Sequence, residues 1–113
     1  MHELGIMINV VNSIEKIAAE NGVTQIETLV LQVGELSPVV PHYLEAVYPA
    51  AVDGTLLQDT KLEIEVVPGN ALCKHCGTAF NLLANKKLCP DCGHSDWQLI
   101  SGTEFLIKEI VAC

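Results

Sequence analysis

Hydrophobic residues recur at helical spacing in the first part of the chain. Between residues 4 and 20 an apolar side chain falls every three or four positions, which gathers these side chains on one face of an α-helix. The apolar positions are Leu4, Met7, Val10, Val11, Ile14, Ile17 and Ala18. Asn21-Gly22 follows, and both residues are typical of the end of a helix. The pattern predicts an amphipathic helix over 4–20 with this face in the core.

Further along, apolar and other residues alternate in two segments, as they do in strands with one buried face. The segments are 25–34 and 61–67. Their predicted inward positions are Leu29, Leu31 and Val33 in the first and Leu62, Ile64 and Val66 in the second. Strand character returns at Leu99-Ile100 and again from Phe105 to Val111. These segments predict a three-stranded sheet.

A second helix is predicted between the first two strands. Pro41 suits its start, because the first N–H groups of a helix have no intrahelical partner. The side chains expected to face the core are Leu44, Val47 and Tyr48. Pro49 is expected to break or bend this helix, since its ring removes one hydrogen bond and clashes with the preceding turn. The chain should then leave the helix at Asp53-Gly54.

Two Cys-x-x-Cys pairs with twelve residues between them carry the clearest chemistry. Each pair is followed by a glycine, and together they comprise Cys73, Cys76, Cys89 and Cys92. Two cysteines on one tight turn can direct both sulfurs at one point, and a short β-hairpin between the turns would complete a tetrahedral four-thiolate site. Zn²⁺ is the usual occupant of such a site, in a structural role, because no coordination position stays open. The alternative is two disulfides or free thiols.

Together these elements predict an α+β fold. Two helices pack on a three-stranded β-sheet, and a four-cysteine zinc-ribbon lobe is inserted between the last two strands. We expect residues 1–69 and 98–113 to form the α/β domain and residues 70–97 to form the zinc-ribbon domain.

Charge and composition limit the kinds of partner that we expect for this chain. Half of the residues are hydrophobic, which is enough for a core. Six lysines and no arginine stand against fourteen acids, so the net charge of -8 disfavours nucleic acid as a partner. With no leader and no membrane-length apolar segment, we expect no membrane association and a cytoplasmic protein whose thiols stay reduced. Cys113, the fifth cysteine, is expected to be a free thiol.

His2 offers a second kind of metal site. The amine of Met1, the amide nitrogen of His2 and its imidazole can close fused chelate rings around one ion. The amide nitrogen or the carboxylate of Glu3 can supply a fourth donor. Nitrogen-rich square-planar sites favour Ni(II) or Cu(II) over zinc. Considered alone, however, a histidine at this position is usually an exposed residue with no role.

The remaining candidates have weaker signals. His75 and His94 adjoin the zinc ligands, and we expect exposed side chains there, with His94 as an alternative ligand in place of a cysteine. His42 is expected to be a surface or capping residue. Glu35 and Asp53 are expected to be solvated loop acids. The sequence contains none of the phosphate-loop, nucleophile-elbow or His-Glu-x-x-His motifs of enzymes.

Several short motifs occur together in a characteristic order. They are Met1-His2-Glu3, Gly34-Glu35-Leu36-Ser37, the two cysteine pairs and Gly102-x-Glu104. In this order and spacing the chain resembles, over its whole length, the HypA/HybF family of nickel metallochaperones for [NiFe]-hydrogenase maturation. The sequence departs from the family at Pro49 and in carrying His75 within its first cysteine pair.

The resemblance implies a function and a set of partners. It implies nickel binding by His2, with Glu3 beside it, and structural zinc in the four cysteines, so the α/β domain would be the nickel-binding one. Its helices would lie on one side of the sheet. The implied partners are the GTPase HypB, the hydrogenase large subunit and, for some members, urease maturation proteins. The hypothesis is therefore a non-enzymatic nickel chaperone. A zinc-ribbon adaptor for protein or nucleic acid is the alternative, and an amidase-like or redox enzyme comes third.

Overall fold

The structure is a computed structural model that describes residues 2–112. Two of the groups considered above, the Met1 amine and the Cys113 thiol, lie outside the described residues. The elements in chain order are α1 (Glu3–Glu20), β1 (Ile26–Gly34), α2 (Pro41–Val52), β2 (Lys61–Val67), β3 (Asn70–Cys73), β4 (Ala79–Asn81), β5 (Trp97–Leu99) and β6 (Phe105–Ala112).

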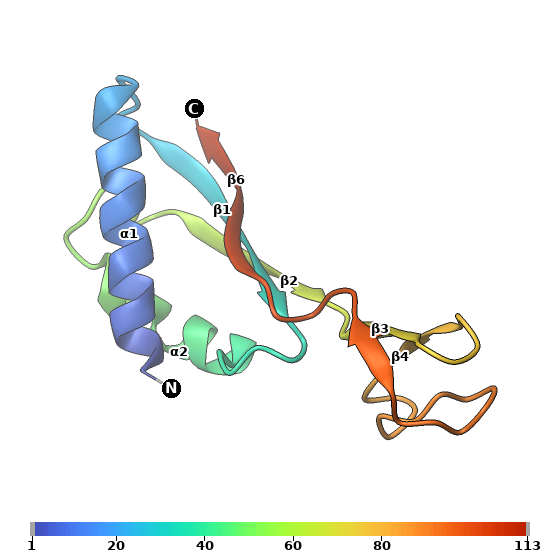
Figure 1. The fold of residues 1–113 in the computed structure, drawn as a ribbon. Coiled ribbons are helices and arrows are strands. Elements are labelled where there is room, and N and C mark those ends of the chain that lie inside the picture. Colours follow the sequence, from blue (N-terminus) through green and yellow to red (C-terminus); the bar gives the residue numbers. More distant parts are fainter. Residues whose placement is uncertain (1, 113) are drawn as a thin grey trace.

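The larger sheet has the strand order β2-β1-β6, with β2 parallel and β6 antiparallel to the central β1. Both helices cover one face of this sheet (Figure 1). The predicted alternation is confirmed in β1, where Leu29, Leu31 and Val33 are fully buried beneath the helices. In β2 the prediction for Val66 is wrong, because its side chain is 54% exposed near the end of an edge strand.

The first helix buries most of the predicted face. The buried apolar residues of α1 are Met7, Val10, Val11, Ile14 and Ala18. Leu4 and Ile17 were expected in the core and are 43% and 45% exposed. A helix that packs through one stripe leaves the margins of its apolar face in water, and these two residues lie at such a margin.

Pro49 does not end the second helix. α2 runs without interruption from Pro41 to Val52, so the predicted break is wrong, while the predicted exit at Asp53 is confirmed. Pro49 is exposed, as is Glu45 one turn earlier. Residues four apart share a helix face, so the carbonyl that loses its N–H partner faces water, where it can be hydrated. Leu44 and Tyr48 are buried and Val47 is partly buried, as predicted.

The segment between β2 and β6 forms a second three-stranded sheet, with the order β4-β3-β5. It extends away from the helices and makes the molecule elongated, with dimensions of 54 × 25 × 17 Å (Figure 1). The expected hairpin between the two cysteine turns is absent among these residues. Instead, β3 pairs with β4 on one side and with β5 on the other. The proposed domain division at 97/98 falls within β5 and remains a proposal.

Candidate metal centre

The two cysteine turns have the same backbone structure. In the first, the N–H of Gly77 donates to the carbonyl of Cys73 at 3.0 Å, and the N–H of Cys73 donates to the carbonyl of Thr78 at 2.9 Å. In the second, Gly93 donates to Cys89 at 2.9 Å and Cys89 donates to His94 at 3.0 Å. Both glycines have positive φ, 77° and 75°, where a side chain would be strained. The glycine after each cysteine pair thus explains the repeated motif.

These turns bring the four predicted ligands together. The Sγ atoms of Cys73 and Cys92 are 3.5 Å apart, as are those of Cys76 and Cys89. All four sulfurs lie within 4.8 Å of one another. Four sulfurs at the Zn–S distance of about 2.3 Å in a tetrahedron are separated by about 3.8 Å, so the arrangement suits a tetrahedral ion. The cysteines are free thiols, too far apart for disulfides with S–S bonds of about 2.0 Å.

The electrostatics of the cluster also favour a cation. Hydrogen bonding to the Thr78 side chain and backbone lowers the pKa of the Cys76 thiol to about 6. At Cys92 the backbone of His94 lowers the pKa, but burial and the three neighbouring thiols outweigh it and raise the pKa to about 12. One thiolate therefore forms readily, while further negative charge is opposed. A bound divalent cation would supply the missing charge compensation.

The two neighbouring histidines lie outside the four-sulfur group. Their rings stack, with centroids 3.9 Å apart, and both side chains are exposed as predicted. His94 Nδ1 is 3.2 Å from the Cys92 sulfur, and His75 Nε2 is 3.7 Å from the Asp96 carboxylate. His94 thus contacts a ligand sulfur. Within residues 2–112 the cluster of potential metal ligands contains the four cysteines and neither histidine. His42, on α2, is exposed and packs near Tyr43.

The second predicted metal site begins at the N-terminal end of α1. His2 is the N-cap residue, it is exposed, and its side chain makes no capping hydrogen bond. Glu3 differs from this: its side chain is buried, and its Oε2 accepts a hydrogen bond from the backbone N–H of Val40 at 3.4 Å. Val40 precedes α2, and the start of α1 lies beside that helix (Figure 1). Nothing in the local sequence pattern indicated this contact.

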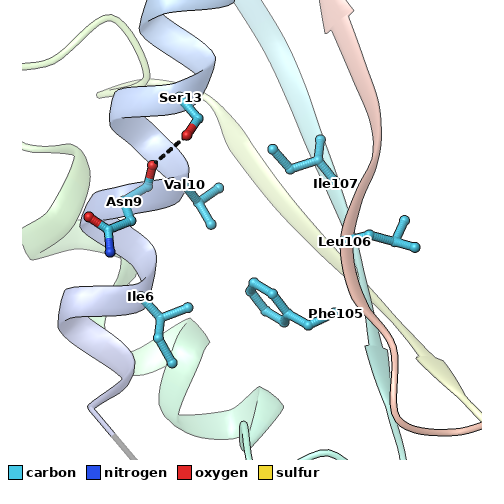
Figure 2. A pocket seen from close by; sticks show the side chains of 7 residues that line it. All are labelled: Ile6, Asn9, Val10, Ser13, Phe105, Leu106 and Ile107. Atoms are coloured by element: carbon cyan, nitrogen blue, oxygen red, sulfur yellow. Dashed lines mark hydrogen bonds between the residues drawn. The ribbon is translucent and has the colours of Figure 1, made fainter.

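An apolar groove lies between α1 and β6 (Figure 2). Its volume is about 330 Å³, and its walls are formed mainly by Ile6, Val10, Phe105, Leu106 and Ile107. The polar residues there are Asn9 and Ser13, and the Ser13 hydroxyl donates to the Asn9 carbonyl at 3.0 Å. The lining contains no metal-ligating or acidic side chain, so the groove is not part of a metal site.

Comparison with known proteins identifies the family. A sequence model described as "HypA: Hydrogenase/urease nickel incorporation, metallochaperone, hypA" matches residues 1–112. The chain belongs to the HypA family. A HypA hydrogenase maturation factor from Geobacter sulfurreducens is 38% identical to it over 110 residues, 97% of each chain. One from Streptomyces avermitilis is 37% identical over 112 residues, which cover 97% of this chain and 86% of the relative.

Two solved HypA structures share the fold. The solution structure of the Ni metallochaperone HypA from Helicobacter pylori superposes with a TM-score of 0.67, covering 99% of this chain and 97% of that one. A second HypA solution structure gives a TM-score of 0.71, with 100% and 97% covered. Both are 21% identical in sequence, and the likeness confirms the predicted fold of two helices on a three-stranded sheet.

Membership of the HypA family decides between the hypotheses drawn from the sequence. The family consists of nickel metallochaperones for hydrogenase maturation, which supports that hypothesis over the zinc-ribbon adaptor. Metallochaperones are not a class of enzymes. The family also fits a four-cysteine metal site of the kind described above. Neither helix within residues 2–112 is long and apolar enough to cross a membrane.

Proposed function

We propose that this HypA-family chain carries one Ni(II) ion as cargo at its N-terminus and delivers it to the large subunit of [NiFe]-hydrogenase. The observation that carries the proposal is the exposed His2 at the tip of α1, in a chain of this family. The proposed donors are the Met1 amine, the His2 amide nitrogen, the His2 imidazole and, as the fourth, the Glu3 amide nitrogen. Such a nitrogen-rich set suits square-planar Ni(II).

The start of α1 leaves these donors available. The first N–H groups of a helix have no intrahelical acceptor, so binding nickel through the backbone nitrogens of His2 and Glu3 breaks no helical hydrogen bond. The carbonyl of His2, in contrast, already accepts the N–H of Ile6 at 3.1 Å. Nickel can therefore bind the backbone nitrogens of His2 and Glu3 while the hydrogen bonds of α1 stay intact.

The four cysteines are proposed to hold one structural Zn²⁺ ion. The donor set and its tetrahedral spacing support this assignment. Because all four positions around the ion would be filled by protein, the zinc would have no catalytic role, and we propose no enzymatic activity for the chain. The lobe of residues 70–97 would be a zinc-ribbon domain and the rest a nickel-binding domain.

The proposed partners follow from nickel delivery. They are the maturation GTPase HypB, the hydrogenase large subunit and, by the same chemistry, urease maturation proteins. With a net charge of -8, nucleic acid is not proposed as a partner. The proposed compartment is the cytoplasm, where the thiol ligands stay reduced.

Nickel titration of the full chain and of a His2→Ala variant tests the proposal. The unaltered chain should bind about one Ni(II), with the weak visible absorption of a square-planar diamagnetic site. His2→Ala should lose this binding and keep its zinc, because the thiolates lie in the other lobe. A short tag ahead of Met1 should also impair nickel binding by removing the amine. Unchanged nickel affinity in His2→Ala would refute the proposed site and direct attention to His75 and His94.

A further inference from the structure

The carboxylate of Glu3 has an unusual environment for a residue at the start of a helix. Its side chain is only 7% exposed, and with Thr60 it is one of two buried polar residues in the described part of the chain. Acidic side chains are rarely this buried unless they are paired. Its carboxylate accepts a hydrogen bond from the backbone N–H of Val40, 37 residues away along the chain. The burial of this acidic side chain at the start of α1 therefore suggests that it has a structural or functional role.

Val40 belongs to a well-connected segment. The N–H of Val39 donates to Ser37 Oγ at 3.1 Å, which constrains the loop before α2. The carbonyl of Val40 accepts the N–H groups of Tyr43 and Leu44 at 3.0 and 3.1 Å, which ties it to the first turn of α2. The Glu3 carboxylate therefore contacts a fixed point, at the helix end whose dipole favours negative charge.

We propose that Glu3 is a positioning residue for nickel, whose carboxylate fastens the base of the N-terminal segment to the start of α2. This inference rests on the proposed nickel site. With the side chain held at Val40, the backbone nitrogens of His2 and Glu3 keep one direction relative to the body. The conformational entropy lost on chelation is then smaller, which raises nickel affinity. The carboxylate acts through its contact with Val40 and does not bind the nickel ion.

The chain provides a matched control on the same helix. Glu15 is partly buried, and its Oε2 accepts the backbone N–H of Leu56 at 3.1 Å. This is the same kind of contact as that between Glu3 and Val40. It lies twelve residues further along α1, about 18 Å from Glu3 at the usual helical rise. Removing it should disturb the attachment of α1 without reaching the nickel donors.

The experiment compares nickel affinity in Glu3→Ala, Glu3→Gln and Glu15→Ala, all in the full chain. Glu3→Ala should bind nickel about 5- to 30-fold more weakly, corresponding to one backbone residue that must now be ordered on binding. Glu3→Gln should retain most of the affinity, because its side-chain carbonyl can accept the same N–H. Glu15→Ala should bind nickel like the unaltered chain.

Two further readouts separate positioning from ligation and from general damage. The visible absorption band of bound nickel should keep its position in Glu3→Ala, because the donor atoms are unchanged. Hydrogen exchange at the Val40 amide should accelerate in Glu3→Ala and stay unchanged in Glu15→Ala. Val40→Pro, which removes the donor, should weaken nickel binding, and adding Glu3→Ala to it should have little further effect.

The inference is overturned if Glu3→Gln is as weak as Glu3→Ala and its absorption band shifts, since the carboxylate would then be a ligand. Unchanged affinity in Glu3→Ala also overturns it. If the proposed nickel site is itself wrong, the result is distinguishable, because His2→Ala would then bind nickel as tightly as the unaltered chain. Loss of nickel in His2→Ala with full affinity in Glu3→Ala refutes the positioning role alone.

Discussion

The two lobes of this chain differ in what holds them together. The body around β1 contains fifteen buried residues in its main cluster, from both helices and the sheet. The lobe around β3 contains five, and two of these are the cysteines Cys73 and Cys89. Burial of apolar surface can stabilise the body alone, whereas so small a core usually needs a metal or another cross-link. In the lobe the metal site is therefore part of the core.

The lobes meet at a joint where the turn after β1 contacts the two segments that connect the lobes, at Gly69 and Gly102. Leu36, which follows β1, packs against the core of the small lobe. Glu35 Oε2 accepts the N–H of Gly69 at 2.7 Å and the side-chain N–H of Asn81 at 3.1 Å. A side chain at Gly34 would collide with the backbone of Gly102. Glu35 is exposed in a turn, as expected of a loop acid, and the structure adds that its carboxylate links the two lobes.

Breaking the metal site should give the largest effect. Cys73→Ser, or removal of zinc by a chelator, should unfold the small lobe, because a structural zinc site contributes about 10 kcal/mol or more to such domains. The body should remain folded on its own core. Hydrogen exchange should show loss of protection in β3, β4 and β5 with protection kept in β1 and β6. A single transition that melts the whole chain would contradict the comparison.

The reciprocal change removes core volume from the body. Ile14 is fully buried in α1, so Ile14→Ala should lower the free energy of unfolding of the body by about 2–5 kcal/mol. Zinc content should stay at one ion per chain. Ile8, 40% exposed on the same helix, is the control, and Ile8→Ala should cost less than about 0.5 kcal/mol. Thermal unfolding with zinc analysis measures both effects, and zinc loss in Ile14→Ala would show that the lobes fold as one unit.

The joint should give the smallest and most pH-dependent effect. Hydrogen bonds from Gly69 and then Asn81 hold the pKa of Glu35 below its ordinary value of 4.5. At a pH above 4.5 the carboxylate is ionised and stabilises the joint. This stabilisation is lost as the pH falls through the lowered pKa of Glu35. Glu35→Ala should accelerate exchange of the Gly69 amide at neutral pH and leave zinc content unchanged. Asp53→Ala, at an exposed loop acid, is the control, and equal exchange in both variants would argue against the joint.

Local sequence determined the two helices, the three strands of the larger sheet and the group of four cysteines. The buried face of α1 and the inward side of β1 follow from spacing within a single element. Likewise, the Cys-x-x-Cys-Gly repeat specifies a turn through neighbouring residues, so the four cysteines that cluster could be named in advance. Met1-His2-Glu3 indicated a nickel site through chelate chemistry and family resemblance, with no need of the fold.

Only the tertiary structure decided which distant segments meet. β6 pairs with β1 across the inserted lobe, and β3 accepts two partners where a local hairpin was expected. The carboxylates of Glu3 and Glu35 find partners 34 to 46 residues away. No local period encodes such contacts, because they form only when the packing of helices and sheets brings separate chain segments together. Whether α2 tolerates Pro49 likewise depends on which side of the helix faces water, and the assembled core determines that side.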